Sequence, residues 1–88
     1  MTQKELQDLY SKVSEAIDGY HSYHVWYCCG QPEWNKDFTQ ISFEVFGTSD
    51  QGEGSEWIEN WGIDSDGKIY SSEEDKPWNN FEEFKANW

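Results

Sequence analysis

Apolar side chains recur every three to four residues at the start of the chain, and this spacing predicts an amphipathic helix over residues 3–18. Thr2 and Glu5 have the spacing of a capping box, which begins a helix, and Gly19 suits the left-handed position that ends one. We expect this helix to pack on a sheet. Its apolar stripe comprises Leu6, Leu9, Tyr10, Val13, Ala16, Ile17 and Tyr20.

The pattern then changes to one that is typical of strands. Residues 21–29 are rich in aromatic and β-branched types, and they predict an interior strand. Gly30 and Pro32 are expected to break this strand, so that residues 30–37 form a loop. One face of the strand would hold His21, Tyr23, Val25, Tyr27 and Cys29, and the other Ser22, His24, Trp26 and Cys28.

Three further strands are predicted in the middle of the chain. Residues 38–46 alternate between apolar and polar, as a half-buried antiparallel strand does, and residues 47–54 are a polar turn. Residues 55–63 predict the next strand, and residues 64–67 a tight turn into a short strand at 68–71. One face of the first of these strands would hold Ile41, Phe43 and Val45. One face of the second would hold Trp57, Glu59, Trp61 and Ile63, with Glu56, Ile58 and Asn60 opposite.

The last segment predicts a short helix after a charged loop at residues 71–77. Asn80 and Glu83 repeat the capping spacing, and apolar residues recur three to four apart at Trp78, Phe81, Phe84 and Trp88. The whole chain of 88 residues is expected to form one domain. The predicted fold is α+β, with an N-terminal helix, a four-stranded antiparallel sheet and a short C-terminal helix, both helices on one side of the sheet.

Charge is the strongest compositional feature. The chain has 18 acidic residues, six lysines and no arginine, for a net charge of −12. Residues 44–88 hold twelve of the acids against three lysines, yet they also hold much of the aromatic content, which a disordered acidic tail would lack. Binding to DNA, RNA or an anionic membrane requires basic side chains, so these ligands are excluded. A folded anionic surface instead suits a basic protein partner.

The acids near the predicted turns and loop are the candidate partner-binding residues. Side chains two apart on one face of a strand stand roughly 6.6–6.8 Å from each other, so carboxylates there can approximate the regular charge of a nucleic-acid backbone. The alternative is an ordinary solvated face. The candidates are Glu53, Glu56, Glu59, Asp64, Asp66, Glu73, Glu74 and Asp75.

A second candidate site combines imidazoles and thiols, the ligand types that zinc prefers. It consists of His21, His24, Cys28 and Cys29. Their spacing matches no zinc-finger pattern, and on a regular strand His24 and Cys28 would lie about 13 Å apart. The alternative is buried thiols and packed histidines. No cofactor is required by the sequence, and zinc is the one metal that these ligands suggest.

Catalysis is not expected. The sequence contains no phosphate-binding glycine loop and no nucleophile elbow, so we predict a binding protein and no catalytic residues. No apolar run approaches the roughly 20 residues of a membrane helix, and the N-terminus lacks the regions of a signal peptide. We therefore expect a cytoplasmic protein with reduced cysteines.

With its N-terminal helix, aromatic strands and acid-rich segments QGEGSEW (51–57) and SSEEDKPW (71–78), the chain resembles the small acidic anti-CRISPR proteins encoded by phages, in particular inhibitors of type II CRISPR nucleases. The resemblance implies an inhibitor in the cytoplasm of an infected bacterial cell, whose acids pair with lysines and arginines of the nuclease and keep target DNA out. Two alternatives stay open. One is an immunity protein that neutralises a basic toxin, and the other is a small zinc-stabilised binding module.

Overall fold

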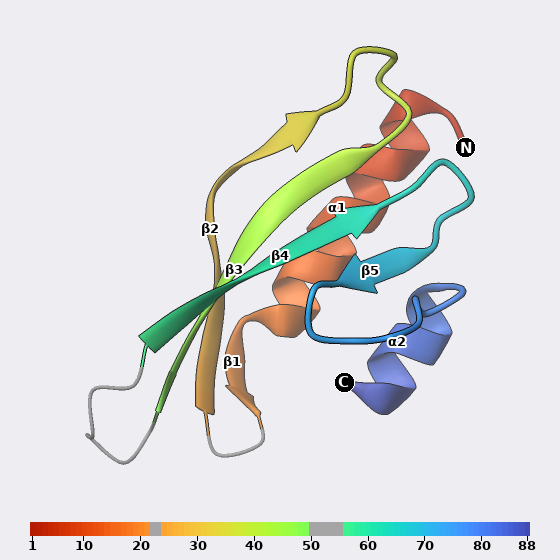
Figure 1. Cartoon of the computed structure of the whole chain (residues 1–88). Helices are drawn as coiled ribbons and strands as arrows, with labels where there is room; N and C mark the ends of the chain where they lie inside the picture. The colour runs from red at the N-terminus through yellow and green to blue at the C-terminus, as the bar shows by residue number, and fades with distance from the viewer. Residues whose placement is uncertain (22–23, 50–55) are drawn as a thin grey trace.

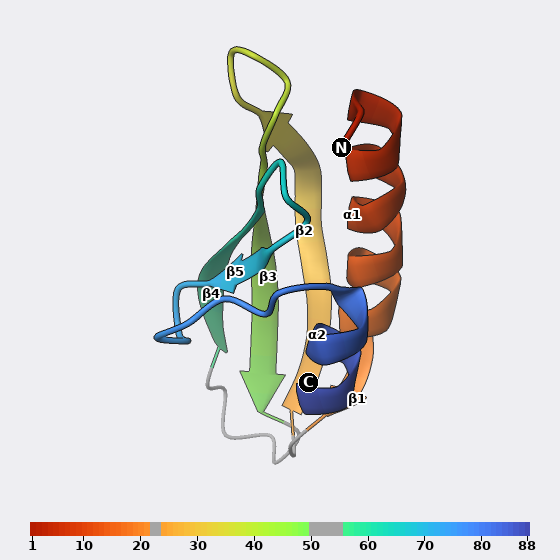
Figure 2. The same ribbon diagram turned by 90° about the vertical axis from the view of Figure 1, so that its right-hand side faces the viewer.

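Two helices and one antiparallel sheet make up the structure, a computed structural model that describes residues 1–21, 24–49 and 56–88, with only the backbone at residues 29, 30 and 49. The strands lie in the order β1-β2-β3-β4-β5, so each pairs with its neighbour in the chain. The sheet curls, and α1 and α2 lie against the same face of it (Figures 1 and 2). The predicted α+β class is confirmed. The elements are α1 (Gln3–Ile17), β1 (Gly19–His21), β2 (His24–Trp34), β3 (Ile41–Ser49), β4 (Glu56–Ile63), β5 (Ile69–Ser71) and α2 (Phe81–Asn87).

The N-terminal helix forms as its sequence predicts. The Thr2 hydroxyl accepts a hydrogen bond from the Glu5 backbone N–H at 3.1 Å, and the Glu5 carboxylate accepts one from the Thr2 N–H at 2.9 Å. Gly19 follows the helix with a φ of +127°, which a glycine adopts without strain. Leu6, Val13 and Ile17 are buried against the sheet. Tyr20 was expected on the same stripe but lies in β1, where its side chain is 61% exposed.

The sheet has five strands, and the prediction of four was wrong. Residues 21–29 were expected to form one strand, but His21 ends β1 and His24 begins β2. The two strands pair antiparallel, with Gly19 opposite Trp26. Both strands contain aromatic residues, and neither residue 22 nor residue 23 is a glycine or proline, so composition alone could not separate them.

The predicted loop at residues 30–37 is also partly wrong, because β2 continues to Trp34. Its register with β3 shifts between Cys29, opposite Glu44, and Glu33, opposite Ser42. Pro32 lies inside this bulge. Because β1 pairs only with residues 24–26, the far half of β2 is an edge strand at which a missing N–H is tolerated.

The connection between β2 and β3 is organised by Asn35. Its side-chain oxygen accepts hydrogen bonds from the backbone N–H groups of Thr39, at 2.7 Å, and Gln40, at 2.9 Å. Residues 38–40, where the strand was predicted to begin, lie in this turn. β3 therefore runs from Ile41 to Ser49 and not over residues 38–46. The predicted turn at residues 47–54 therefore loses its first part to β3, and its remainder lies outside the described residues.

The C-terminal elements agree with the prediction. The turn after β4 places Gly67 at a φ of +83°, and α2 begins after Asn80, whose side chain accepts a hydrogen bond from the Glu83 N–H at 2.8 Å. Neither helix in the described part of the chain has the length and hydrophobicity that crossing a bilayer requires.

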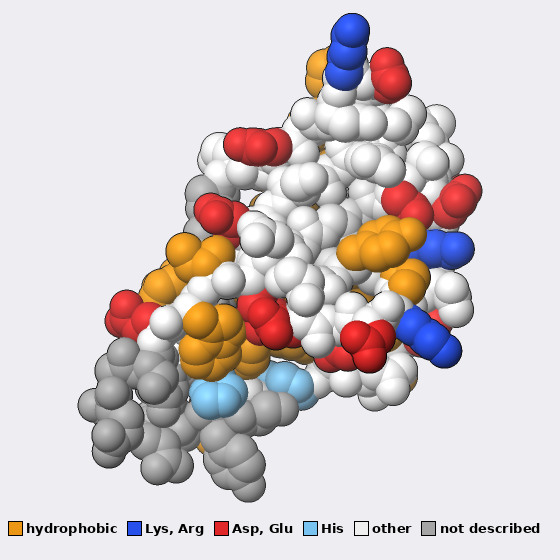
Figure 3. Space-filling view, viewed as in Figure 1, with side chains coloured by type: hydrophobic (Ala, Val, Ile, Leu, Met, Phe, Trp, Pro, Cys, Tyr) orange, Lys and Arg blue, Asp and Glu red, His pale blue; other side chains and the backbone are white. Residues whose placement is uncertain are grey.

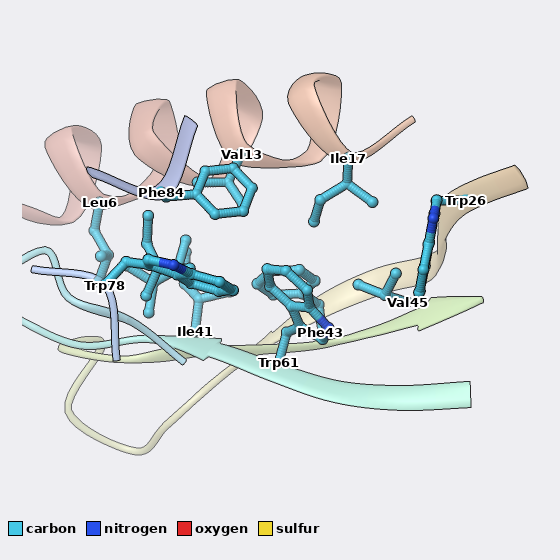
Figure 4. Close-up of a cluster of buried hydrophobic side chains, with 12 residues drawn as sticks. Leu6, Val13, Ile17, Trp26, Ile41, Phe43, Val45, Trp61, Trp78 and Phe84 are labelled. Carbon is cyan, nitrogen blue, oxygen red and sulfur yellow. The ribbon is translucent and has the colours of Figure 1, made fainter. Parts of the chain in front are cut away.

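The core fills the space between the helices and the concave face of the sheet (Figure 4). Because a small domain buries a modest fraction of its surface, large side chains carry much of the stabilisation, and several of these are tryptophans. Of the described residues, Glu59 and Ser71 are the polar ones that are buried with this core. The core residues are Leu6, Val13, Ile17, Trp26, Ile41, Phe43, Val45, Trp61, Ile63, Ile69, Trp78 and Phe84.

Gly47 makes this packing possible, and replacing it tests the arrangement. It lies opposite both Trp26 and Trp57 in the sheet, and an added Cβ would stand 2.6 Å from a carbon of the Trp57 ring and 3.0 Å from one of Trp26. We expect Gly47→Ala to lower the free energy of unfolding in urea by about 1–3 kcal/mol. Gly62→Ala is the control, because its Cβ would meet only a backbone oxygen at 3.4 Å. Equal effects of the two substitutions would show that the rings of Trp26 and Trp57 do not confine Gly47.

Candidate functional site

The predicted partner-binding acids are spread over several elements. Figure 3, which views the open face of the sheet, shows acidic side chains distributed over that face with no single cluster. Glu53 lies outside the described residues. Five of the others are exposed and can meet a partner directly, namely Glu56 on β4, Asp66 in the turn before β5, and Glu73, Glu74 and Asp75 between β5 and α2.

Asp64 has a structural role in the turn that follows β4. One of its carboxylate oxygens accepts hydrogen bonds from the backbone N–H groups of Asp66 and Lys68, both at 2.9 Å. The other accepts one from the Tyr70 hydroxyl at 2.9 Å. This hydrogen bond to a carboxylate raises the pKa of Tyr70 above its usual value. Both oxygens of Asp64 therefore already hold the turn together.

Glu59 does not belong to the outer acidic surface, because its side chain is only 6% exposed. One of its oxygens accepts a hydrogen bond from the Trp57 indole N–H at 3.0 Å. The other accepts from the Trp61 indole N–H at 3.0 Å and from the Ser71 hydroxyl at 3.4 Å. Burial of a carboxylate is tolerated only with such hydrogen bonds, so this residue is fixed in one position by three neutral donors.

Glu59 lies at the bottom of a hollow with a volume of about 300 Å³, which we call the tryptophan pocket. Its apolar wall comes from β2, β4, the segment after β5 and the C-terminus, and consists of Trp26, Trp61, Trp78 and Trp88. The polar lining consists of Glu59, Ser71, Glu73, Glu74, Asn87 and His21. Elements that are far apart in sequence thus bring four indoles and three carboxylates together.

The indoles of the tryptophan pocket hold one another in place. The Trp88 ring contacts Trp26 and Trp61 edge to face, with ring centroids 4.9 Å and 5.3 Å apart. Trp78 stacks on Trp61 at 5.5 Å, and His21 stacks on Trp88 at 4.6 Å. Edge-to-face and offset-stacked pairs are the favoured arrangements of aromatic rings. The wall of the pocket is therefore a continuous packed cluster.

Among the candidate zinc ligands, the side chains of His21, His24 and Cys28 are described, and they do not form a metal site. In the described part of the chain, no three His, Cys, Asp or Glu side chains are placed to hold a metal ion. His21 stacks on Trp88, whereas the His24 ring contacts Trp57 edge to face at 4.9 Å. Cys28 is partly buried next to the core, and the Cys29 side chain is not described. The geometry thus gives zinc no site among the described residues.

The open face of the sheet offers a second surface. Tyr27, Phe46 and Ile58 lie directly opposite one another on β2, β3 and β4, and the rings of the first two are 4.8 Å apart. A groove of about 610 Å³ also lies on the sheet, with Glu33 and Glu44 in its lining. The groove is larger than the tryptophan pocket, but both carboxylates in its lining are exposed.

The sequence predicted which residues of β4 share a face, but it did not predict that these residues line a pocket. The alternation in β4 correctly placed Trp57, Glu59 and Trp61 on one face, and a charged residue in the middle of a buried face was the available signal. The contributions of Trp26 and Trp88 depend on tertiary packing, which one sequence does not show. Comparison with protein-family models, curated proteins and solved structures gives no match to this chain.

Replacing Glu59 tests whether its carboxylate ties the pocket together. Glu59→Gln would turn an amide N–H toward an indole N–H, leaving a buried donor without an acceptor. We expect the free energy of unfolding in urea to fall by about 1–3 kcal/mol. Glu56→Gln on the same strand removes the same charge from an exposed position, so its effect should stay within about 0.5 kcal/mol. If the two variants were equally stable, the hydrogen bonds to Glu59 would not have the role assigned to them.

Proposed function

We propose that this chain is a binding protein that inhibits a basic, DNA-handling protein by occupying the cleft that receives DNA. The observation that supports this is negative charge that the chain itself does not neutralise. Eighteen acids face six lysines, so at least twelve acids have no lysine to pair with. The charge stands on a packed aromatic scaffold, with exposed carboxylates on β4, in the turn before β5 and in the segment before α2.

The physical basis of this inhibition is competition for positive charge. Duplex DNA carries one negative charge per roughly 1.7 Å of its axis, and a cleft that binds it presents lysines and arginines. An acidic protein is attracted to the same cleft, associates faster because of the attraction and loses affinity as salt rises. Because the described scaffold is folded before it binds, it does not lose the entropy that a disordered acidic tail loses on ordering.

The segment between β5 and α2 is the part of the surface best suited to make this contact. Glu73, Glu74 and Asp75 are three consecutive exposed acids, and the first two also line the tryptophan pocket. Binding energy at protein interfaces concentrates on buried aromatic and basic residues, whereas rim charges mainly steer association. In this segment the acids can steer association, and the neighbouring tryptophans can contribute aromatic contacts to the interface.

The partner class that we favour is a type II CRISPR effector nuclease. The support is the resemblance to phage-encoded inhibitors of these nucleases, together with the match between this acidic surface and a DNA channel. The proposed setting is the cytoplasm of an infected bacterial cell. No cofactor has a part in this function, because charge and shape suffice to block a channel.

Reversing the charge of the segment before α2 tests the proposal. The measurement is the concentration of protein that halves the rate of target-DNA cleavage by a guide-loaded type II nuclease. For the triple variant Glu73→Lys/Glu74→Lys/Asp75→Lys, we expect this concentration to rise by about tenfold or more, because attraction becomes repulsion at the contact. The unchanged protein should also lose potency as salt rises.

The matched control changes the net charge equally at sites away from this segment. Asp8→Lys/Glu15→Lys/Asp37→Lys also replaces three exposed acids by lysines, on α1 and in the loop after β2. It should retain most of the inhibition. Equal losses in the two triple variants would show that only net charge matters, and an unchanged potency of the first would refute the assignment of this surface.

A further inference from the structure

Glu59 is a buried anion whose hydrogen-bond donors are all neutral. The indoles of Trp57 and Trp61 and the hydroxyl of Ser71 bind its two oxygens. A carboxylate has about four lone-pair positions, so these three donors leave one position open. None of the described residues that line the tryptophan pocket is a lysine, and the imidazole in its lining, His21, stacks on Trp88 and makes no hydrogen bond to Glu59.

The tryptophan pocket leads from the surface to this carboxylate. Glu73, Glu74 and Asn87 in its lining are exposed, whereas Glu59 and Trp61 are buried, which places the acids of the segment before α2 at the mouth and Glu59 at the bottom. The volume of about 300 Å³ is at the small end of the range for ligand sites, roughly 300–1,000 Å³. A pocket of this size suits a single side chain better than a large ligand.

The walls of the pocket favour a cation that is planar and weakly hydrated. Indole is the aromatic ring that attracts cations most strongly, and four indoles line the pocket. A guanidinium stacks on such rings, loses its hydration more readily than an ammonium does, and has five donors that several carboxylates can share. Its charge would compensate Glu59, and its remaining N–H groups would face Glu73 and Glu74.

We infer that the tryptophan pocket binds the guanidinium group of an arginine side chain, with Glu59 as its buried counter-ion. The inference rests on the proposed function in one respect, since it takes the arginine to belong to the basic partner. It goes beyond the proposed function because it assigns one chemical group of the partner, a guanidinium, to the tryptophan pocket. Exposed acids alone would accept lysine and arginine equally, whereas this pocket discriminates between them.

The experiment titrates the intact protein with a peptide that has one arginine, acetyl-Gly-Arg-Gly-amide, and follows the six indole N–H signals in ¹⁵N-labelled protein by NMR. We expect saturable shifts in the signals of Trp57 and Trp61, because their N–H groups donate to Glu59. The peptide with citrulline, a neutral analogue of the same shape, should bind about tenfold more weakly or not at all. The lysine peptide should bind with intermediate affinity.

Variants locate the binding. Glu59→Gln should abolish the shifts, and since this variant can lose stability, Trp88→Leu provides a second test by removing one wall of the pocket. Trp34→Leu is the matched control, because Trp34 is likewise half-buried but does not line the pocket. It should bind the arginine peptide as the unchanged protein does.

The outcomes separate this inference from the proposed function. Equal binding of the arginine and citrulline peptides, or equal losses in Trp88→Leu and Trp34→Leu, would overturn the pocket assignment and leave inhibition by surface charge standing. Arginine-specific shifts in Trp57 and Trp61 with no inhibition of the nuclease would support the pocket and overturn the proposed partner. The inference is supported if the shifts are lost in Glu59→Gln and in Trp88→Leu but are retained in Trp34→Leu.

Discussion

The hydrogen bonds between the buried carboxylate of Glu59 and the indoles of Trp57 and Trp61 connect the core of this protein to its charged surface. A buried carboxylate is costly unless donors surround it, and these two indoles lie two residues to either side of it on the same face of β4. Trp61 in turn contacts Trp78 and Trp88, so the position of the carboxylate depends on the packing of α2 and of the segment before it. One residue thereby links the sheet, the C-terminal helix and the acids at the mouth of the tryptophan pocket.

A chain of 88 residues with a net charge of −12 folds against its own repulsion. The aromatic core supplies the opposing stabilisation, because each large ring buries roughly 150–250 Å². Distribution of the acids also matters. The described acids are spaced over both helices, three of the strands and the segments between them, so the self-repulsion is divided among several parts of the surface. A cationic partner would relieve this repulsion, which gives binding a source of free energy that an uncharged surface of the same shape lacks.

The sequence predicted the helices well, because their signals are local. The capping residues Thr2 and Asn80 and the period of the apolar stripe depend only on neighbours within a few residues. The sheet was predicted less well. Residues 22 and 23, between β1 and β2, include no glycine or proline, and Pro32 is accommodated by a bulge at an edge that only the strand order reveals. The same limit applies to the site. Periodicity placed Glu59 on the same face as Trp57 and Trp61. The position of Trp88 in the same pocket depends on how α2 packs against the sheet, and no local pattern encodes that.

Inhibition by the proposed route requires that this protein and DNA compete for one cationic cleft. The most direct measurement is the affinity of the protein for a guide-loaded type II nuclease, determined by calorimetry with the DNA channel either empty or filled by a target duplex that cannot be cleaved. We expect heat of binding with the empty channel and none with the filled one. Equal affinity for both forms would contradict it, because the protein would then bind elsewhere than where DNA does.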